Sequence, residues 1–164
     1  MSLVSSILAE IEQESRTTRK VLERVPDDKL GWSPHAKSMT LGRLASHIAA
    51  VPARVLLWLR AGEFDLAQAG PGAGLDQTAA IVAEFEKNMQ EIREYLVSID
   101  DSALKETFTL RKGDKTITTM TKMGIVRAVL LNHTYHHRGQ LSVYLRLLEV
   151  PLPPIYGPTA DEQM

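Results

Sequence analysis

The sequence predicts an all-α protein, a four-helix bundle with a small β-hairpin inserted before the last helix. Four segments of the 164-residue chain place apolar residues three and four positions apart, which is the spacing of one face of an α-helix. Two long connections separate these segments, and helices of this kind bury their apolar faces against one another. With no internal repeat and no sign of a second domain, residues 1–164 are expected to form a single domain.

The first predicted helix is amphipathic and ends before Pro26. The residues that recur at helical spacing on its inward face are Val4, Ile7, Leu8, Ile11, Thr18, Leu22 and Val25, all of them apolar except the threonine. A loop with two prolines runs on to Met39 and is expected to wall a cavity. Thr40 then provides an N-cap for a second helix, which Pro52 is expected to bend.

The third helix and the hairpin are indicated by turn residues. A glycine-rich crossing at 70–74 precedes Asp76, which is the expected N-cap of the third helix. Two threonine-rich, alternating stretches, Glu106–Leu110 and Lys115–Thr118, flank Lys112-Gly113-Asp114. Alternation around such a turn predicts a β-hairpin.

Composition excludes several classes of protein. The absence of cysteine excludes disulfides, thiolate ligands and a cysteine nucleophile. Acidic and basic residues are interspersed with a net charge of -1, which argues against a nucleic-acid surface. No apolar run approaches the roughly 20 residues that cross a membrane, and the glutamates of the first segment argue against a signal peptide. We expect a cytoplasmic protein with no nucleic-acid or membrane partner.

The fourth predicted helix carries the most informative motif, His133-Thr-Tyr-His136-His137-Arg-Gly-Gln140. Because residues four apart share one helix face, His133 and His137 can direct their imidazoles at one ion. Both lie within the apolar stripe that runs from Val126 to Leu148, and a shared cation satisfies two buried imidazoles at once. Three prolines end this helix, and the tail after it is expected to fold back over the bundle.

His47 is the expected third ligand, because it lies on the apolar face of the second helix. Three imidazoles from two helices leave coordination positions open, as in catalytic metal sites. His136 competes as a ligand through its three-residue spacing to His133, but ranks below the pair of His133 and His137. Otherwise His136 is expected to contact a ligand or the substrate, or to be a surface or interface residue.

Three further side chains are candidates for the surroundings of the ion. Gln140 is placed to orient the free ring N–H of a ligand. Thr18 interrupts the apolar face of the first helix, where it either leaves room for water or substrate or bonds back to the backbone. Trp32 lies in the loop before the second helix, as a pocket wall or a core anchor.

Four motifs together resemble the DinB-like (DinB/YfiT) superfamily, whose members are expected to be metalloenzymes. They are Trp32-x-Pro34-His35, Leu41-Gly-Arg-Leu-Ala-Ser-His47, His133-x-x-x-His137-Arg-Gly-Gln140 and Ile155-Tyr-Gly-Pro158. The resemblance spans nearly the whole chain. It implies an up-down-down-up four-helix bundle that binds a divalent metal, commonly zinc or nickel, through the positions of His47, His133 and His137. It also implies homodimers and an association with damage or stress responses.

The resemblance implies a function only in outline, because the characterised relatives include thiol-dependent S-transferases, a maleylpyruvate isomerase and hydrolases. The leading hypothesis is a mononuclear metal-dependent enzyme, in which the ion lowers the pKa of a bound water or activates the thiolate of a low-molecular-weight thiol cosubstrate. The lack of an evident carboxylate base near the motif favours the thiol route. The alternative is a noncatalytic, metal-binding, stress- or damage-associated dimeric binding protein, in which a fourth protein ligand fills the open position.

Overall fold

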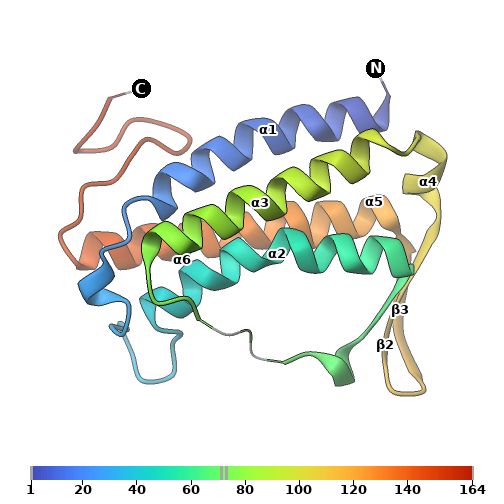
Figure 1. The fold of residues 1–164 in the computed structure, drawn as a ribbon, viewed down its shortest axis with the longest axis horizontal. Helices are drawn as coiled ribbons and strands as arrows, with labels where there is room; N and C mark the ends of the chain where they lie inside the picture. Colours follow the sequence, from blue (N-terminus) through green and yellow to red (C-terminus); the bar gives the residue numbers. More distant parts are fainter. Residues whose placement is uncertain (1, 71, 73, 164) are drawn as a thin grey trace.

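The computed structural model describes residues 2–70, 72 and 74–163, most of which are helical. Positions 71 and 73 of the predicted glycine-rich crossing lie outside the described residues. The long helices pack side by side (Figure 1). They are α1 (Leu3–Leu22), α2 (Leu41–Ala61), α3 (Thr78–Val97) and a continuous C-terminal helix made of α5 (Lys122–Ile125), the π-helical segment η3 (Val126–His133) and α6 (Thr134–Leu147).

Helix α2 begins directly after Thr40, which is its N-cap as predicted from the sequence. The backbone N–H of Arg43 donates to the Thr40 hydroxyl oxygen at 3.3 Å, which satisfies one of the N–H groups left without a helical partner. Pro52 is accommodated inside α2, whose residues stay helical on both sides of it. The helix ends at Gly62, whose left-handed backbone (φ 73°) suits glycine best.

The predicted N-cap of α3 is wrong. Gln77, not Asp76, precedes the helix, and its side chain makes no capping bond. The cap comes from the short 3-10 helix η1 (Asp27–Lys29), where Oδ1 of Asp27 accepts from the Thr78 N–H at 2.6 Å. Asp27, which is distant in the sequence, therefore provides the capping interaction that was predicted for Asp76.

The predicted all-α bundle with a small hairpin is also wrong, because the chain forms a three-stranded mixed sheet at one end of the helices (Figure 1). In it, β2 (Thr107–Lys112) pairs antiparallel with β3 (Lys115–Thr121) and parallel with β1 (Glu63–Asp65). Asp65 holds β1 to the hairpin, since its carboxylate accepts from the Gly113 N–H at 3.0 Å and lies 2.7 Å from the Arg111 guanidinium.

A further short helix, α4 (Asp101–Lys105), follows α3 and supports the start of α1. The Asp101 carboxylate accepts from the backbone N–H groups of Leu3 at 2.9 Å and Val4 at 3.0 Å. A negative charge at this position also interacts favourably with the helix dipole.

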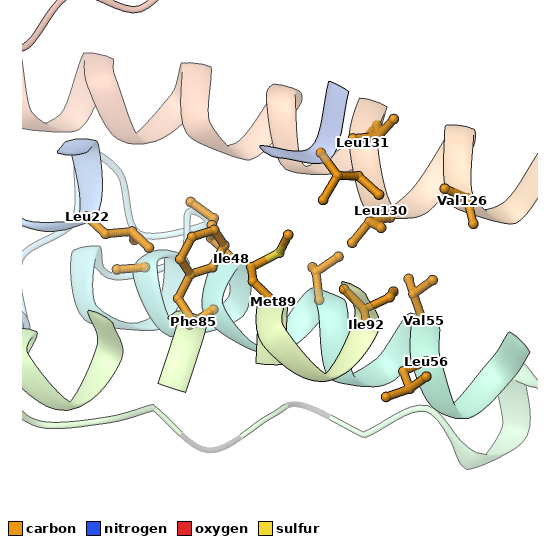
Figure 2. Packing of buried hydrophobic residues seen from close by; sticks show 14 of the residues in the cluster. Leu22, Ile48, Val55, Leu56, Phe85, Met89, Ile92, Val126, Leu130 and Leu131 are labelled. Carbon is orange, nitrogen blue, oxygen red and sulfur yellow. The ribbon is translucent and has the colours of Figure 1, made fainter. Parts of the chain in front are cut away.

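The hydrophobic core lies between the long helices. Figure 2 shows side chains of α2, α3 and η3, among them Ile48, Met89 and Leu130, gathered in the space between these helices. By length and hydropathy α2 could cross a membrane, but 56% of its most apolar window is buried inside the protein. Burial of this kind is what a core helix of a soluble protein shows, because its apolar face packs against other helices.

The C-terminal tail folds back over α1, as predicted, and a buried ion pair holds it there (Figure 1). Arg138 is only 1% exposed, and its guanidinium lies 2.8 Å from the Glu14 carboxylate. The same guanidinium donates to the Thr18 hydroxyl at 3.1 Å and to the Tyr156 hydroxyl at 2.6 Å. Thr18 therefore belongs to this network between α1, α6 and the tail.

Candidate metal centre

Three histidines converge between α2 and the C-terminal helix. His47 lies in α2, His133 is the last residue of η3, and His137 follows one turn later in α6. Nε2 of His133 is 2.9 Å from Nε2 of His47 and 3.0 Å from Nε2 of His137. One potential ligand atom from each residue lies within 4.8 Å of the other two.

Burial keeps these imidazoles neutral at physiological pH. It lowers the pKa of His47 from its ordinary 6.5 to about 4, with further lowering by His137, His133 and the positive charge of Arg54. Burial also lowers the pKa of His133 and of His137. Neutral rings retain the nitrogen lone pairs that bind a cation.

Gln140 fixes the orientation of one of the rings. Its amide oxygen lies 2.7 Å from Nδ1 of His137. Because a carbonyl oxygen only accepts, Nδ1 donates, and the Nε2 lone pair of His137 faces the other two rings. Sequence reasoning selected Gln140 for this type of contact.

The donor set fits a divalent metal ion. Three neutral imidazoles suit zinc, nickel, copper and iron, and the Nε2 atom of His133 lies only 2.9 and 3.0 Å from those of the other two rings, close enough for all three to share one ion. Without a cation, Nε2 of His133 carries either one hydrogen or one lone pair, so it cannot form a well-aligned hydrogen bond with both neighbouring rings, whereas a cation satisfies all three nitrogens. His47, His133 and His137 would hold the ion.

The other predicted residues lie around or away from this cluster. His136 is exposed, with its ring centroid 4.9 Å from that of His137, and is outside the group that converges. Trp32 is half-buried and packs edge-on against Tyr144 at 5.6 Å. Thr18 contacts Arg138 instead of the histidines.

Two cavities open beside the histidines. His47 and His133 line a cavity of about 460 Å³, whose walls also include Trp58, Phe64 and Val129. A second cavity of about 230 Å³ contains His47 and extends towards the start of α2. The cluster therefore borders space that a small molecule can occupy.

Sequence reasoning missed two arginines that line these cavities. Arg54 lines both of them and Arg43 lines the smaller one. Arg43 is four residues before His47 and Arg54 is seven after it, so helical spacing places all three on one face of α2. This spacing is the feature of the sequence from which the two arginines could have been predicted to lie near His47.

Comparison with known proteins agrees with this architecture. The sequence profile of the DinB family matches residues 1–163. The chain is 28% identical over 154 residues to the uncharacterized protein YrdA of Bacillus subtilis (strain 168), covering 92% of this chain and 86% of YrdA.

Two crystal structures share the fold. One is a DinB-like protein of Bacillus cereus ATCC 10987, with a TM-score of 0.75 and 22% identity, covering 93% of this chain and 97% of that one. The other is the DinB-like protein YjoA of Bacillus subtilis, with a TM-score of 0.72 and 17% identity, covering 97% of this chain and 99% of that one. With the profile match over nearly its whole length, the chain belongs to the DinB family.

Proposed function

We propose that this protein is a mononuclear metal-dependent enzyme in which His47, His133 and His137 hold one divalent ion, zinc or nickel. The observation that carries the proposal is the cavity of about 460 Å³ beside the cluster, lined by His47 and His133. The ion, when bound, supplies a Lewis acid at the edge of this cavity. The histidines hold the site, and Gln140 keeps the ring of His137 in the required orientation.

The open cavity favours an enzyme over a noncatalytic binding protein. A structural site is closed by a fourth protein ligand, whereas a catalytic one keeps a position free. In the part of the chain that the structure describes, the cluster contains three histidines and no fourth ligand. The side of the cluster that borders the cavity is therefore available to a substrate.

For the reaction, we propose transfer to a low-molecular-weight thiol, with hydrolysis as the alternative. Among the described residues no Asp or Glu lines either cavity, so no carboxylate is placed to deprotonate an attacking water. In the transfer, the thiol loses its proton to solvent and its sulfur forms a bond to an electrophilic carbon of the second substrate. The bond to the leaving group breaks, and that group departs with the bonding electrons and takes up a proton.

The test is the metal content of untagged protein, measured by elemental analysis, for the wild type and four variants. We expect close to one ion per chain in the wild type and in His136→Ala, and loss of the ion in His47→Ala, His133→Ala and His137→Ala. His136→Ala is the matched control, because it removes an adjacent imidazole outside the cluster. A wild type that contains no metal and takes up none would refute the proposal.

The reaction is tested on the metal-loaded protein with electrophilic substrates in the presence and absence of small thiols. Turnover that needs the thiol supports transfer, and turnover in its absence supports hydrolysis. In either case, activity that survives the loss of the ion in His133→Ala would contradict the proposed role of the site.

A further inference from the structure

Arg54 is a charged residue that lines both of the cavities beside the histidines. It lies on α2 two turns after His47, is half-buried, and lines both the larger and the smaller cavity. Burial is the main cause of the lowered pKa of His47 and of His133, and the positive charge of Arg54 is among the further causes for both rings.

No carboxylate among the described residues neutralises Arg54 or Arg43. No ion pair joins either guanidinium to a carboxylate of residues 2–70, 72 and 74–163, whereas the structure pairs many other arginines. Arg54 lines both cavities and Arg43 lines the smaller one, and the described walls of neither cavity contain an acidic side chain. Two positive charges in a recess without a counter-charge attract an anion, and a guanidinium binds carboxylate, sulfonate and phosphate groups through paired hydrogen bonds.

The larger cavity adds an apolar surface next to this charge. Trp58 stacks on Phe64 with ring centroids 4.3 Å apart, so α2 and β1 together form an aromatic wall. Val51 and Val129 line the same cavity from α2 and η3. A cavity of about 460 Å³ is within the range that holds a small organic ligand.

Gly72 brings the loop backbone close to Arg54. A Cβ at this position would lie 2.5 Å from Nη2 of Arg54, closer than non-bonded atoms approach. The glycine therefore leaves space for the guanidinium beside the loop, at the point where the two cavities share Arg54.

We propose that the substrate is an amphipathic anion, with a negatively charged group bound by Arg54 and Arg43 and an apolar part lying against Trp58 and Val129. This inference rests on the proposed function, because it names the substrate class of the same site. The arginines bind and position the substrate with its apolar part in the larger cavity, next to His47 and His133.

The experiment is a fluorescence titration of the zinc-loaded, full-length protein with two probes of the same shape. Anilinonaphthalene sulfonate has an aromatic body and an anionic group, and N-phenylnaphthylamine has the aromatic body alone. The proteins compared are the wild type, Arg54→Gln and Arg60→Gln. Arg60 is the matched control, because it is also on α2 but is exposed, with its guanidinium 5.9 Å from the ring centroid of Tyr95.

We expect Arg54→Gln to weaken binding of the sulfonate roughly tenfold or more, the effect of losing a hydrogen-bonded charge. Arg60→Gln should bind it like the wild type, and the neutral probe should bind all three proteins alike. The inference is overturned if the wild type binds no sulfonate saturably, if Arg54→Gln binds it unchanged, or if Arg60→Gln loses as much affinity.

Removal of the zinc with a chelator separates this inference from the proposed function. If chelation abolishes sulfonate binding by the wild type, the ion and not Arg54 holds the anion, which overturns the inference and leaves the metal site in place. If the protein takes up no metal but Arg54→Gln still binds the sulfonate tenfold more weakly, the anion site is supported and the metal-dependent function fails.

Discussion

The amide oxygen of Gln140 lies 2.7 Å from Nδ1 of His137, three residues earlier on the same helix. Hydrogen-bond partners of this kind fix the ring and raise its basicity, and their loss costs about 10–100-fold in metal affinity. We therefore expect Gln140→Ala to weaken zinc binding by this factor, measured by competition with a chromophoric chelator. Gln140 is exposed, so the stability of the metal-free fold should change little.

Gln140→Glu is the matched control for that substitution, because a carboxylate still accepts from Nδ1. Its zinc affinity should stay close to that of the wild type. Equal losses in the alanine and glutamate variants would show that the contact with His137 does not matter for the site.

The metal-free protein should lose stability in mild acid. Burial lowers the pKa of His47 from its ordinary 6.5 to about 4 in the folded state, so the unfolded chain takes up this proton at the higher pH. The free energy of unfolding therefore keeps its full value above pH 6.5 as far as His47 is concerned, and it decreases as the pH falls towards 4. After allowance for the half-exposed ring, the loss should be on the order of 1 kcal/mol.

Urea unfolding with a chelator present, at neutral pH and at about pH 4, measures this loss. In His47→Gln the stability should depend less on pH over the same interval, since glutamine does not titrate. An identical pH dependence in the two proteins would show that His47 does not contribute to it.

Arg138→Ala should destabilise the fold strongly, by about 3–5 kcal/mol, because it leaves the Glu14 carboxylate buried without its partner. Replacement of both residues, by Arg138→Met with Glu14→Leu, should recover most of the loss, since no buried charge then remains. Denaturant unfolding of the three proteins provides the comparison. Destabilisation of the double variant by more than Arg138→Ala alone would contradict this account.

Asp65→Ala should loosen the sheet locally, at a cost of about 1–3 kcal/mol. The substitution removes the acceptor of the Ala67 and Gly113 N–H groups and the partner of Arg111. Faster hydrogen exchange at Ala67 and Gly113 is the expected signature. Asp114→Ala, at the exposed hairpin turn, is the control and should leave both amides protected.

The long helices could be predicted because the apolar spacing that marks them is local. β1 could not, since a three-residue strand with Phe64 as its one apolar residue shows no alternation, and its partner β2 lies far along the chain. The N-cap of α3 was missed for a similar reason, because Asp27 reaches Thr78 only after the chain has folded.

The histidine cluster was predictable to the extent that its pattern is local. The four-residue spacing of His133 and His137 can be seen in one helix, while His47 needed its apolar helix face and the family resemblance to be selected. Arg54 shares that face, but its importance comes from cavities that form only when β1 and the loop after it fold against α2.

The π-helical segment Val126–His133 also affects how the chain tolerates a change in length. Its hydrogen bonds reach the fifth residue instead of the fourth, so each turn holds more residues than an α-helix does. The segment therefore accommodates an additional residue while Val126 and Leu130 keep their faces relative to His133. Removal of one residue here should allow an ordinary α-helix with these faces kept, whereas the same deletion within α6 would rotate the residues on its two sides by about 100° relative to each other. A single-residue deletion should therefore be tolerated better in this segment than in α6.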